Sequence, residues 1–293
     1  MKYRKLTALL ALTGLTALLA AAPALTVGAQ SRAAIHRHVL IAQPSSIGAA
    51  GDSITNAFDV NSNGALQKNP QYSWSTGTIA AVDSQYQRIL AKNAKIKGKY
   101  YNVAGFGAKM KQLDAQMKTL AADKVGYATV LMGDDDVCTP TIAAMTPVAT
   151  FKTQFEQALH DFFAKDDSAH VYVSSIADVY RVWQLFHSNT QAEYVWNTLA
   201  PALTGQYVCH SMLNPKATAA QRQVVRNREI AYNAALAAVC KSFSHCRWDG
   251  DANFNRQFTA KDISTVDYIS PSVQGQADLA TSSWAHSYWP GTK

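Results

Sequence analysis

The chain has 293 residues, of which 48% are hydrophobic and 16% are charged, and its formal net charge is +7. This length is sufficient for one α/β domain with a full core. The lysines and arginines are spread along the sequence without a dense block, which argues against a nucleic-acid partner.

The N-terminus has the pattern of a secretory signal peptide. Lys2, Arg4 and Lys5 precede an apolar run over residues 6–22, and small residues lead up to Ala29. This pattern predicts a signal peptide over residues 1–29, cleaved after Ala29, and therefore a secreted, extracellular protein. The alternative is an uncleaved anchor helix, because the apolar run is long for a signal peptide. No later segment has the roughly 18 unbroken apolar residues of a membrane span, so none is expected after cleavage.

The rest of the chain is expected to form a polar leader over residues 30–45 and a single domain over residues 46–293. Short apolar runs predict strands, and apolar residues at helical spacing predict helices between them. The predicted strands are 46–50, 100–104, 128–132 and 171–175. The predicted helices are 78–91, 110–122, 148–164, 217–240 and 272–289. Loops are expected over 56–72 and 243–264, and residues 178–214 are expected to be irregular or helical. Strands that alternate with helices predict a parallel sheet covered on both faces.

A candidate nucleophile follows the first predicted strand. Gly51 allows a sharp turn, and Asp52-Ser53 then presents a hydroxyl beyond the carboxyl end of the strand. In open parallel α/β sheets, ligands bind at that edge. The motif alone is weak, because Gly-Asp-Ser occurs by chance in many loops.

Polar groups also follow two other predicted strands. Gly107 lies in the turn after the second strand, and Asp135 follows the third. The carboxyl ends of successive parallel strands lie along one edge, so these residues can converge with Ser53. A further polar block, residues 267–276, precedes the last predicted helix.

Taken together, these blocks resemble the GDSL, or SGNH, hydrolase family, and within it the secreted bacterial branch of phospholipase B-like esterases. Gly51-Asp52-Ser53 matches the family's first block, and residues 102–109 match its second. Residues 133–138 stand where that branch has Gly-Ala-Asn-Asp-Val-Cys, and residues 267–276 where it has Asp-x-x-His-Pro-Ser-x-x-Gly-Gln. The likeness runs from about residue 46 to residue 289. It implies a three-layer α/β/α, flavodoxin-like fold around a central parallel sheet.

The resemblance also implies acyl-ester hydrolysis without a cofactor. Ser53 would be the nucleophile, and Asp267 would be the acid that orients a catalytic histidine. The oxyanion hole would take backbone N–H groups from Ser53 and Gly107, together with an asparagine side chain.

The sequence departs from this pattern at two positions. Ser270 stands where the family has its histidine, and Asp135 stands where it has the oxyanion asparagine. A serine cannot act as a base near neutral pH, and an ionised aspartate repels a developing oxyanion. Two hypotheses assign Asp135 a role: protonated, it would donate to the oxyanion, and ionised, it would be a poor base for Ser53.

Two functions therefore follow from the sequence. The first is a secreted serine hydrolase of acyl esters, of the lipase or esterase type, that acts on a small-molecule ester or a lipid with an altered or impaired mechanism. The second is an inactive protein of the same fold that binds a lipid or an acylated glycan. The loss of a triad member leaves only about 10³–10⁴-fold catalysis over water in serine proteases.

The four cysteines predict two disulfides in an exported chain, and three connectivities are possible. Cys240 and Cys246 would close a short loop, which would leave Cys138 for Cys209. The cysteine spacings do not resemble a zinc site, and His36-x-His38 has no evident third ligand, so no metal is expected.

Overall fold

A five-stranded parallel sheet forms the centre of the computed structural model, which describes residues 41–61 and 65–291. The strand order is β2-β1-β3-β4-β5, and all four pairings between neighbours are parallel. The strands are β1 (Ile47–Gly51), β2 (Tyr100–Asn102), β3 (Tyr127–Leu131), β4 (His170–Val173) and β5 (Cys246–Trp248). The predicted parallel sheet of a flavodoxin-like α/β fold is confirmed.

Alternating side chains of the central strands supply two separate cores. In β3, Ala128 and Val130 belong to one buried cluster, whereas Tyr127 and Leu131 belong to the other. Because side chains alternate along a strand, a strand that is apolar at every position buries both faces of the sheet.

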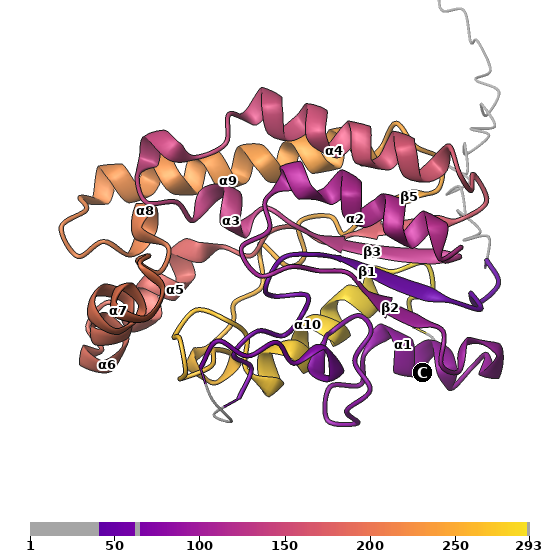
Figure 1. The fold of residues 1–293 in the computed structure, drawn as a ribbon, viewed down its shortest axis with the longest axis horizontal. Helices are drawn as coiled ribbons and strands as arrows, with labels where there is room; N and C mark the ends of the chain where they lie inside the picture. Colours follow the sequence, from indigo (N-terminus) through magenta and orange to yellow (C-terminus); the bar gives the residue numbers. More distant parts are fainter. Residues whose placement is uncertain (1–40, 62–64, 292–293) are drawn as a thin grey trace, which may run out of the picture. The chain divides into compact units, whose positions relative to one another are not determined.

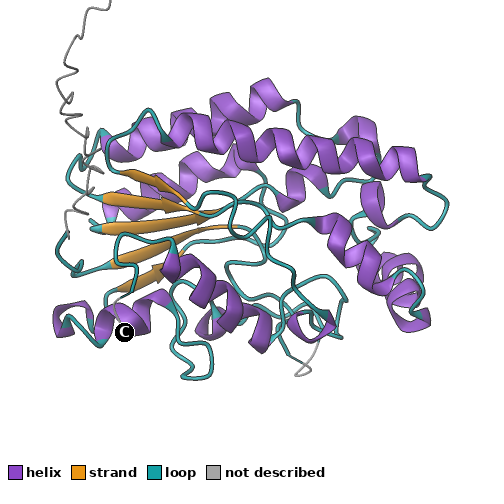
Figure 2. Ribbon diagram, turned by 180° about the vertical axis from the view of Figure 1, so that it is seen from behind, coloured by secondary structure: helices purple, strands orange, loops and turns teal. Residues whose placement is uncertain are grey.

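Helices cover both faces, as Figures 1 and 2 show. One face carries α2 (Met110–Ala122), α4 (Val148–Phe163) and α9 (Ala219–Cys240), and the opposite face carries α1 (Gln85–Leu90) and α10 (Val273–Ala285). Helix α2 has the bounds that its apolar spacing predicts, with Met110, Leu113, Met117 and Leu120 fully buried. The predicted three-layer arrangement is confirmed.

Shorter elements connect these layers. The short helices are α3 (Asp134–Val137), α5 (Val179–Phe186), α6 (Thr190–Tyr194), a π-helix (Val195–Leu199), α7 (Ala200–Thr204) and α8 (His210–Leu213). Single 3₁₀ turns cover Pro70–Tyr72, Ala94–Ile96, Ile142–Ala144 and Ala260–Asp262. All described residues belong to one compact unit, Leu40–Lys293.

Two predicted helices are too long. The helix predicted over 78–91 begins only at Gln85, because Asp83 has a positive φ of 50° and the Ser84 side chain then caps the helix. The helix predicted over 272–289 ends at Ala285. There the hydroxyl of Ser287 donates to the carbonyl oxygen of Trp284 at 2.7 Å and competes with continued helix.

The strand β5 lies inside a segment predicted as a loop. It pairs with β4 through only three residues, with Cys246 opposite Val171. Three residues are too few for a period-2 pattern to be recognised in the sequence.

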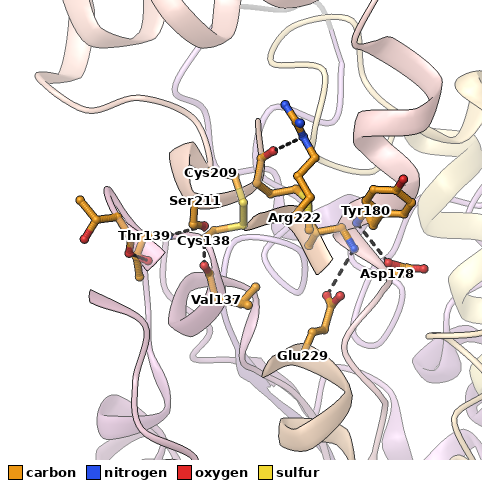
Figure 3. The surroundings of a disulfide bond; sticks show 12 residues. Val137, Cys138, Thr139, Asp178, Tyr180, Cys209, Ser211, Arg222 and Glu229 are labelled. Atoms are coloured by element: carbon orange, nitrogen blue, oxygen red, sulfur yellow. Dashed lines mark hydrogen bonds between the residues drawn. A yellow bond between two sulfur atoms is a disulfide. The ribbon is translucent and has the colours of Figure 1, made fainter. Parts of the chain in front are cut away.

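Both disulfides of the short-loop pairing are present and confirm it. Cys240 is bonded to Cys246, and Cys138 is bonded to Cys209 across 71 residues of sequence. Ser211 reinforces the second bridge (Figure 3): its hydroxyl donates to Val137 O at 2.6 Å and accepts from Thr139 N at 3.2 Å. The bridge and these bonds fix α8 against the segment that follows β3.

The predicted signal peptide, residues 1–29, and most of the predicted leader, residues 30–45, lie outside the described residues. Across the described residues, no helix combines the length and the apolar character required to cross a membrane.

Candidate active site

A cavity of about 340 Å³ opens at the carboxyl edge of the sheet. The segment after every strand contributes to its wall: Ser53 after β1, Phe106 after β2, Asp135 after β3, Asp178 after β4 and Arg256 after β5. This is the edge where open parallel α/β sheets bind ligands.

The pairing of β1 with β3 brings Ser53 and Asp135 to neighbouring strand ends. Gly51 is paired with Leu131 in the sheet, so Ser53 and Asp135 each follow this pair of residues by only a few positions. The close approach of β1 to β3 requires glycine at position 51, because a Cβ there would lie 2.2 Å from the carbonyl oxygen of Leu131. The φ of Gly51 is +153°. The close approach of the two strands therefore positions the candidate nucleophile.

Ser53 is half-buried, and its hydroxyl is uncommitted. Within residues 41–61 and 65–291, no side chain or backbone group forms a hydrogen bond with its Oγ, although its carbonyl oxygen accepts from Phe58 N at 3.0 Å. The hydroxyl lines the cavity without a resident base.

Asp267 and Ser270 line the same cavity, in the loop before α10. Oδ1 of Asp267 accepts from the backbone N–H groups of Ile269, at 3.0 Å, and Ser270, at 2.9 Å. Burial raises the pKa of Asp267 to about 6, and the hydrogen bonds from Ser270 and Ile269 oppose that rise. The side chain at position 270 is only 5% exposed. The Asp267 carboxyl is thus used to hold its own turn.

Asp135 is one of the residues that line the cavity. Its Oδ2 is buried and forms no hydrogen bond. Burial raises the pKa of Asp135 to about 7, the charge of Asp136 adds to the rise, and Lys109 opposes it. A carboxyl with this pKa is part protonated and part ionised near neutral pH.

The neighbouring Asp136 has a structural role. Its Oδ2 accepts from Met110 N at 2.7 Å, and its Oδ1 accepts from the Thr146 hydroxyl at 2.5 Å. The first bond connects α3 to the start of α2, and the second connects α3 to the segment before α4. Together they fix the helix that carries Asp135.

Two further carboxyls lie at this edge, and the sequence predicts no catalytic role for either. Asp52 and Asp134 each have a buried Oδ2 without a hydrogen-bond partner. Burial raises the pKa of both well above its ordinary value, and the charges of nearby carboxyls raise it further. Their burial and proximity follow from the β1–β3 pairing, which no motif encodes.

Gly107 does not line the cavity, although the sequence predicts that it contributes to the oxyanion hole. It has a positive φ of 68° and is exposed. Its neighbour Phe106 does line the cavity and stacks on Phe58 with ring centroids 4.2 Å apart. The role of Gly107 in an oxyanion hole stays a prediction.

No described histidine lines the cavity. His210 follows lining residues, and its ring lies tilted beside that of Tyr207 with the ring centroids 4.3 Å apart, but His210 is not itself a lining residue. His187 is bonded to the carbonyl oxygen of Trp183 at 2.9 Å, and His36 and His38 lie outside the described residues. In the described part of the chain, no group of three or more His, Cys, Asp or Glu side chains is placed to hold a metal ion.

The remaining wall is largely apolar. It includes Val182, Leu199 and Ile263, together with the disulfide-bonded Cys138 and Cys209. Four large apolar side chains of the wall are also exposed to solvent: Leu66 (46%), Phe106 (56%), Leu203 (56%) and Tyr207 (50%). An apolar compartment next to a free hydroxyl suits a ligand that carries a hydrocarbon chain and a polar bond.

Comparison with known proteins gives a family match. The family model described as GDSL-like lipase/acylhydrolase matches residues 47–280. This span contains Ser53, Asp135, Asp267 and Ser270. No curated protein sequence matches the chain.

Solved structures with similar folds share little sequence with the chain. A protein assigned as a GDSL-like lipase from Parabacteroides merdae ATCC 43184 has 16% identity and a TM-score of 0.52, over 84% of this chain and 97% of that chain. An extracellular lipase from Streptomyces rimosus has 13% identity and a TM-score of 0.47, over 81% of this chain and 99% of that one. Phospholipase A1 from Streptomyces albidoflavus NA297 has 15% identity and a TM-score of 0.46, over 81% and 98%. At 16% identity, the likeness to the Parabacteroides merdae protein supports the fold alone.

Proposed function

The chain belongs to the family of GDSL-like lipases and acylhydrolases, and we propose that it is a secreted hydrolase of acyl esters that uses Ser53 as its nucleophile. One observation carries the proposal. The hydroxyl of Ser53 is uncommitted and lines a cavity of about 340 Å³ whose wall is mainly apolar. The hydroxyl supplies the attacking oxygen, and the apolar wall accommodates the acyl chain.

A serine hydroxyl needs a base before it can attack an ester at a useful rate. Ser270 lacks a basic nitrogen, and Asp267 is engaged by the backbone of its own turn. Asp135 follows the strand next to that of Ser53, lines the same cavity and has a free Oδ2. We therefore assign the general base to the carboxylate of Asp135. Burial supports this role, because it raises the pKa of Asp135 to about 7 and so strengthens the base.

In the acylation step, Oγ of Ser53 bonds to the ester carbonyl carbon while its proton passes to Asp135. The alcohol oxygen of the substrate then leaves with that proton, and the acyl group stays on Ser53. In the second step, water attacks the acyl carbon, Asp135 takes a proton from the water, and this proton returns to Oγ as the carboxylic acid leaves.

The same proton transfer also removes the repulsion between an ionised Asp135 and the developing oxyanion. Asp135 becomes neutral as the oxyanion forms, so the two negative charges do not coexist. Neutral Asp135 is then a hydrogen-bond donor, as buried protonated carboxylic acids are in other oxyanion holes. Backbone N–H groups of Ser53 and Gly107 are the further donors that we propose.

Export of the protein is part of this proposal. The signal-like pattern of residues 1–29 supports it, and so do the two disulfides, because such bonds persist in oxidising compartments.

The test is hydrolysis of nitrophenyl acetate, butyrate and octanoate by the purified protein, with Ser53→Ala beside it. We expect hydrolysis that is lost in Ser53→Ala while the circular dichroism spectrum is unchanged. Activity that persists in Ser53→Ala would reject this nucleophile. Hydrolysis absent from the natural chain, but present after Ser270→His combined with Asp135→Asn, would show that the scaffold binds esters without cleaving them.

A further inference from the structure

Arg256 is the only lysine, arginine or histidine among the described residues that line the cavity. It lies in the segment after β5, which also contributes Phe258 and Ile263 to the cavity wall. It therefore supplies the positive charge of a wall that otherwise consists of apolar side chains, carboxyls and neutral polar groups.

The guanidinium of Arg256 has no polar partner among the described residues. No described carboxylate forms an ion pair with it, and its Nε is buried without a hydrogen-bond acceptor. Its one close side-chain contact of the cation–π kind is with Phe258, whose ring centroid lies 5.6 Å from the guanidinium carbon. Asp262 and Asp278 lie within electrostatic range, but neither is bonded to it.

Every other arginine in the described part of the chain donates a side-chain hydrogen bond. Arg226 binds the carboxylate of Asp178 at 2.8 Å, and Arg222 donates to three backbone carbonyl oxygens. The remaining ones are Arg88, Arg181, Arg228 and Arg247. The free guanidinium at the cavity is thus an exception within this fold.

A partly buried guanidinium without an acceptor is unfavourable, since the buried Nε–H of Arg256 has lost water without gaining a partner. The carboxyls of the wall do not supply one. Asp178 is paired with Arg226, and burial raises the pKa of Asp59, Asp135 and Asp267, which favours their neutral forms. The planar fork of an arginine fits the two oxygens of a carboxylate or a phosphate.

We propose that Arg256 binds an anionic oxygen group, a phosphate or a carboxylate, on the acyl ester that Ser53 cleaves. The substrate is then an anionic amphiphile, with its acyl chain against the apolar wall and its anionic group at Arg256. This inference rests on the proposed ester hydrolysis and adds the class of substrate.

The test uses three esters with the same acyl chain: monolauroylglycerol, monolauroylglycerol 3-phosphate and the lauroyl ester of glyceric acid. Binding is measured calorimetrically on Ser53→Ala, below the concentration at which the lipids form micelles. We expect at least one anionic ester to bind about tenfold or more tightly than the neutral ester. The phosphate and carboxylate esters show which anion fits.

Arg256→Gln, added to Ser53→Ala, is expected to bring the affinity ratio between anionic and neutral esters close to one. Arg256→Lys should give an intermediate ratio, because it keeps the charge and loses the fork. Arg88→Gln is the matched control, since it removes the same charge at a site outside the cavity, and it should keep the ratio.

If Ser53→Ala binds all three esters with equal affinity, the inference is overturned before any Arg256 variant is measured. A preference for anionic esters that survives Arg256→Gln would overturn it as well. The proposed function fails separately: if anionic esters bind through Arg256 and none is hydrolysed by the natural chain, the binding site stands and the hydrolase does not. If Ser53 hydrolyses all three esters with equal kcat/KM, the hydrolase is supported and the anion site is rejected.

Discussion

The backbone N–H of Ser270 donates a hydrogen bond of 2.9 Å to Oδ1 of Asp267. In the hydrolase triad, an aspartate at this place orients an imidazole three residues later. Here the carboxyl binds the backbone of Ser270, the residue that we predict from the sequence to stand in place of the histidine. On this prediction, the turn is retained, but the side chain that would carry a proton from Ser53 is missing.

Replacement of Ser270 by histidine should raise ester hydrolysis. An imidazole at this position would lie three residues after Asp267, in the wall that also contains Ser53. General base catalysis by a positioned side chain contributes about 10²–10⁴-fold, so we expect a gain on the order of 10²-fold in kcat/KM for nitrophenyl butyrate.

The control for this variant is Ser270→Asn, which adds a polar side chain without a base and should give no gain. Because the natural serine is only 5% exposed, thermal melting of both variants must show that they fold. A folded Ser270→His with unchanged kcat/KM would mean that Asp267 and Ser53 are not arranged as a triad.

Replacement of Asp135 by asparagine separates the two roles that this residue can have. As the base, Asp135 acts when ionised, so kcat/KM of the natural chain should rise with pH through about 7, the pKa to which burial raises this carboxyl. Asp135→Asn should then lower kcat/KM on the order of 10²-fold and remove the rise. The measurement is a pH–rate profile of both proteins from about pH 5 to about pH 9, which brackets that pKa.

The opposite profile would reject the base. If Asp135 acts only as a protonated donor to the oxyanion, activity falls as the pH rises through about 7. Asparagine would then match or exceed aspartate, because its amide donates at every pH.

The sequence predicts the layers of this fold better than the contents of its cavity. Helix α2 is predictable because Met110, Leu113 and Met117 repeat at helical spacing. The start of α1 is not, because it depends on the backbone of Asp83 and the cap at Ser84.

At the site, Ser53, Asp135 and Asp267 are found from the order of their sequence blocks. Arg256 has no such signal, because a single arginine in a predicted loop forms no pattern. Its position follows from β5, a strand too short to be recognised, and its lack of a partner is visible only once every described neighbour is placed. The raised pKa of Asp135 likewise depends on burial, which single residues do not reveal.

Replacement of Asp267 by asparagine should stabilise the fold increasingly as the pH rises. Burial raises the pKa of Asp267 from 3.8 to about 6. A carboxyl whose pKa is raised by folding stabilises the fold fully below its unfolded pKa and loses that contribution as the pH rises through the folded pKa. The difference in the free energy of unfolding, variant minus natural chain, should therefore grow by up to about 3 kcal/mol from about pH 4 to about pH 7.

Urea unfolding at several pH values across this range measures the difference. The amide oxygen of asparagine can still accept from Ile269 N and Ser270 N, so the turn should persist. Asp123→Asn, at an exposed position, corrects for the change in net charge. A difference that stays constant across this pH range would mean that Asp267 is not held in its protonated form.

Removal of the two disulfides should have unequal effects. Cys138 and Cys209 are separated by 71 residues, and Cys240 and Cys246 by only 6. If a bridge acts mainly by restricting the unfolded chain, the first contributes about 4 kcal/mol and the second about 2 kcal/mol. Double substitution of each pair by alanine, followed by urea unfolding, tests this order.

Ester hydrolysis should also distinguish the two bridges. Cys138 and Cys209 line the cavity. Of the two double substitutions, only that of Cys138 and Cys209 should therefore lower ester hydrolysis under conditions where both variants remain folded.

Equal losses of stability in the two double variants would show that contacts in the folded state determine the contribution of each disulfide. The hydrogen bonds of Ser211 beside the longer bridge are contacts of this kind, because they hold Val137 and Thr139 on either side of Cys138.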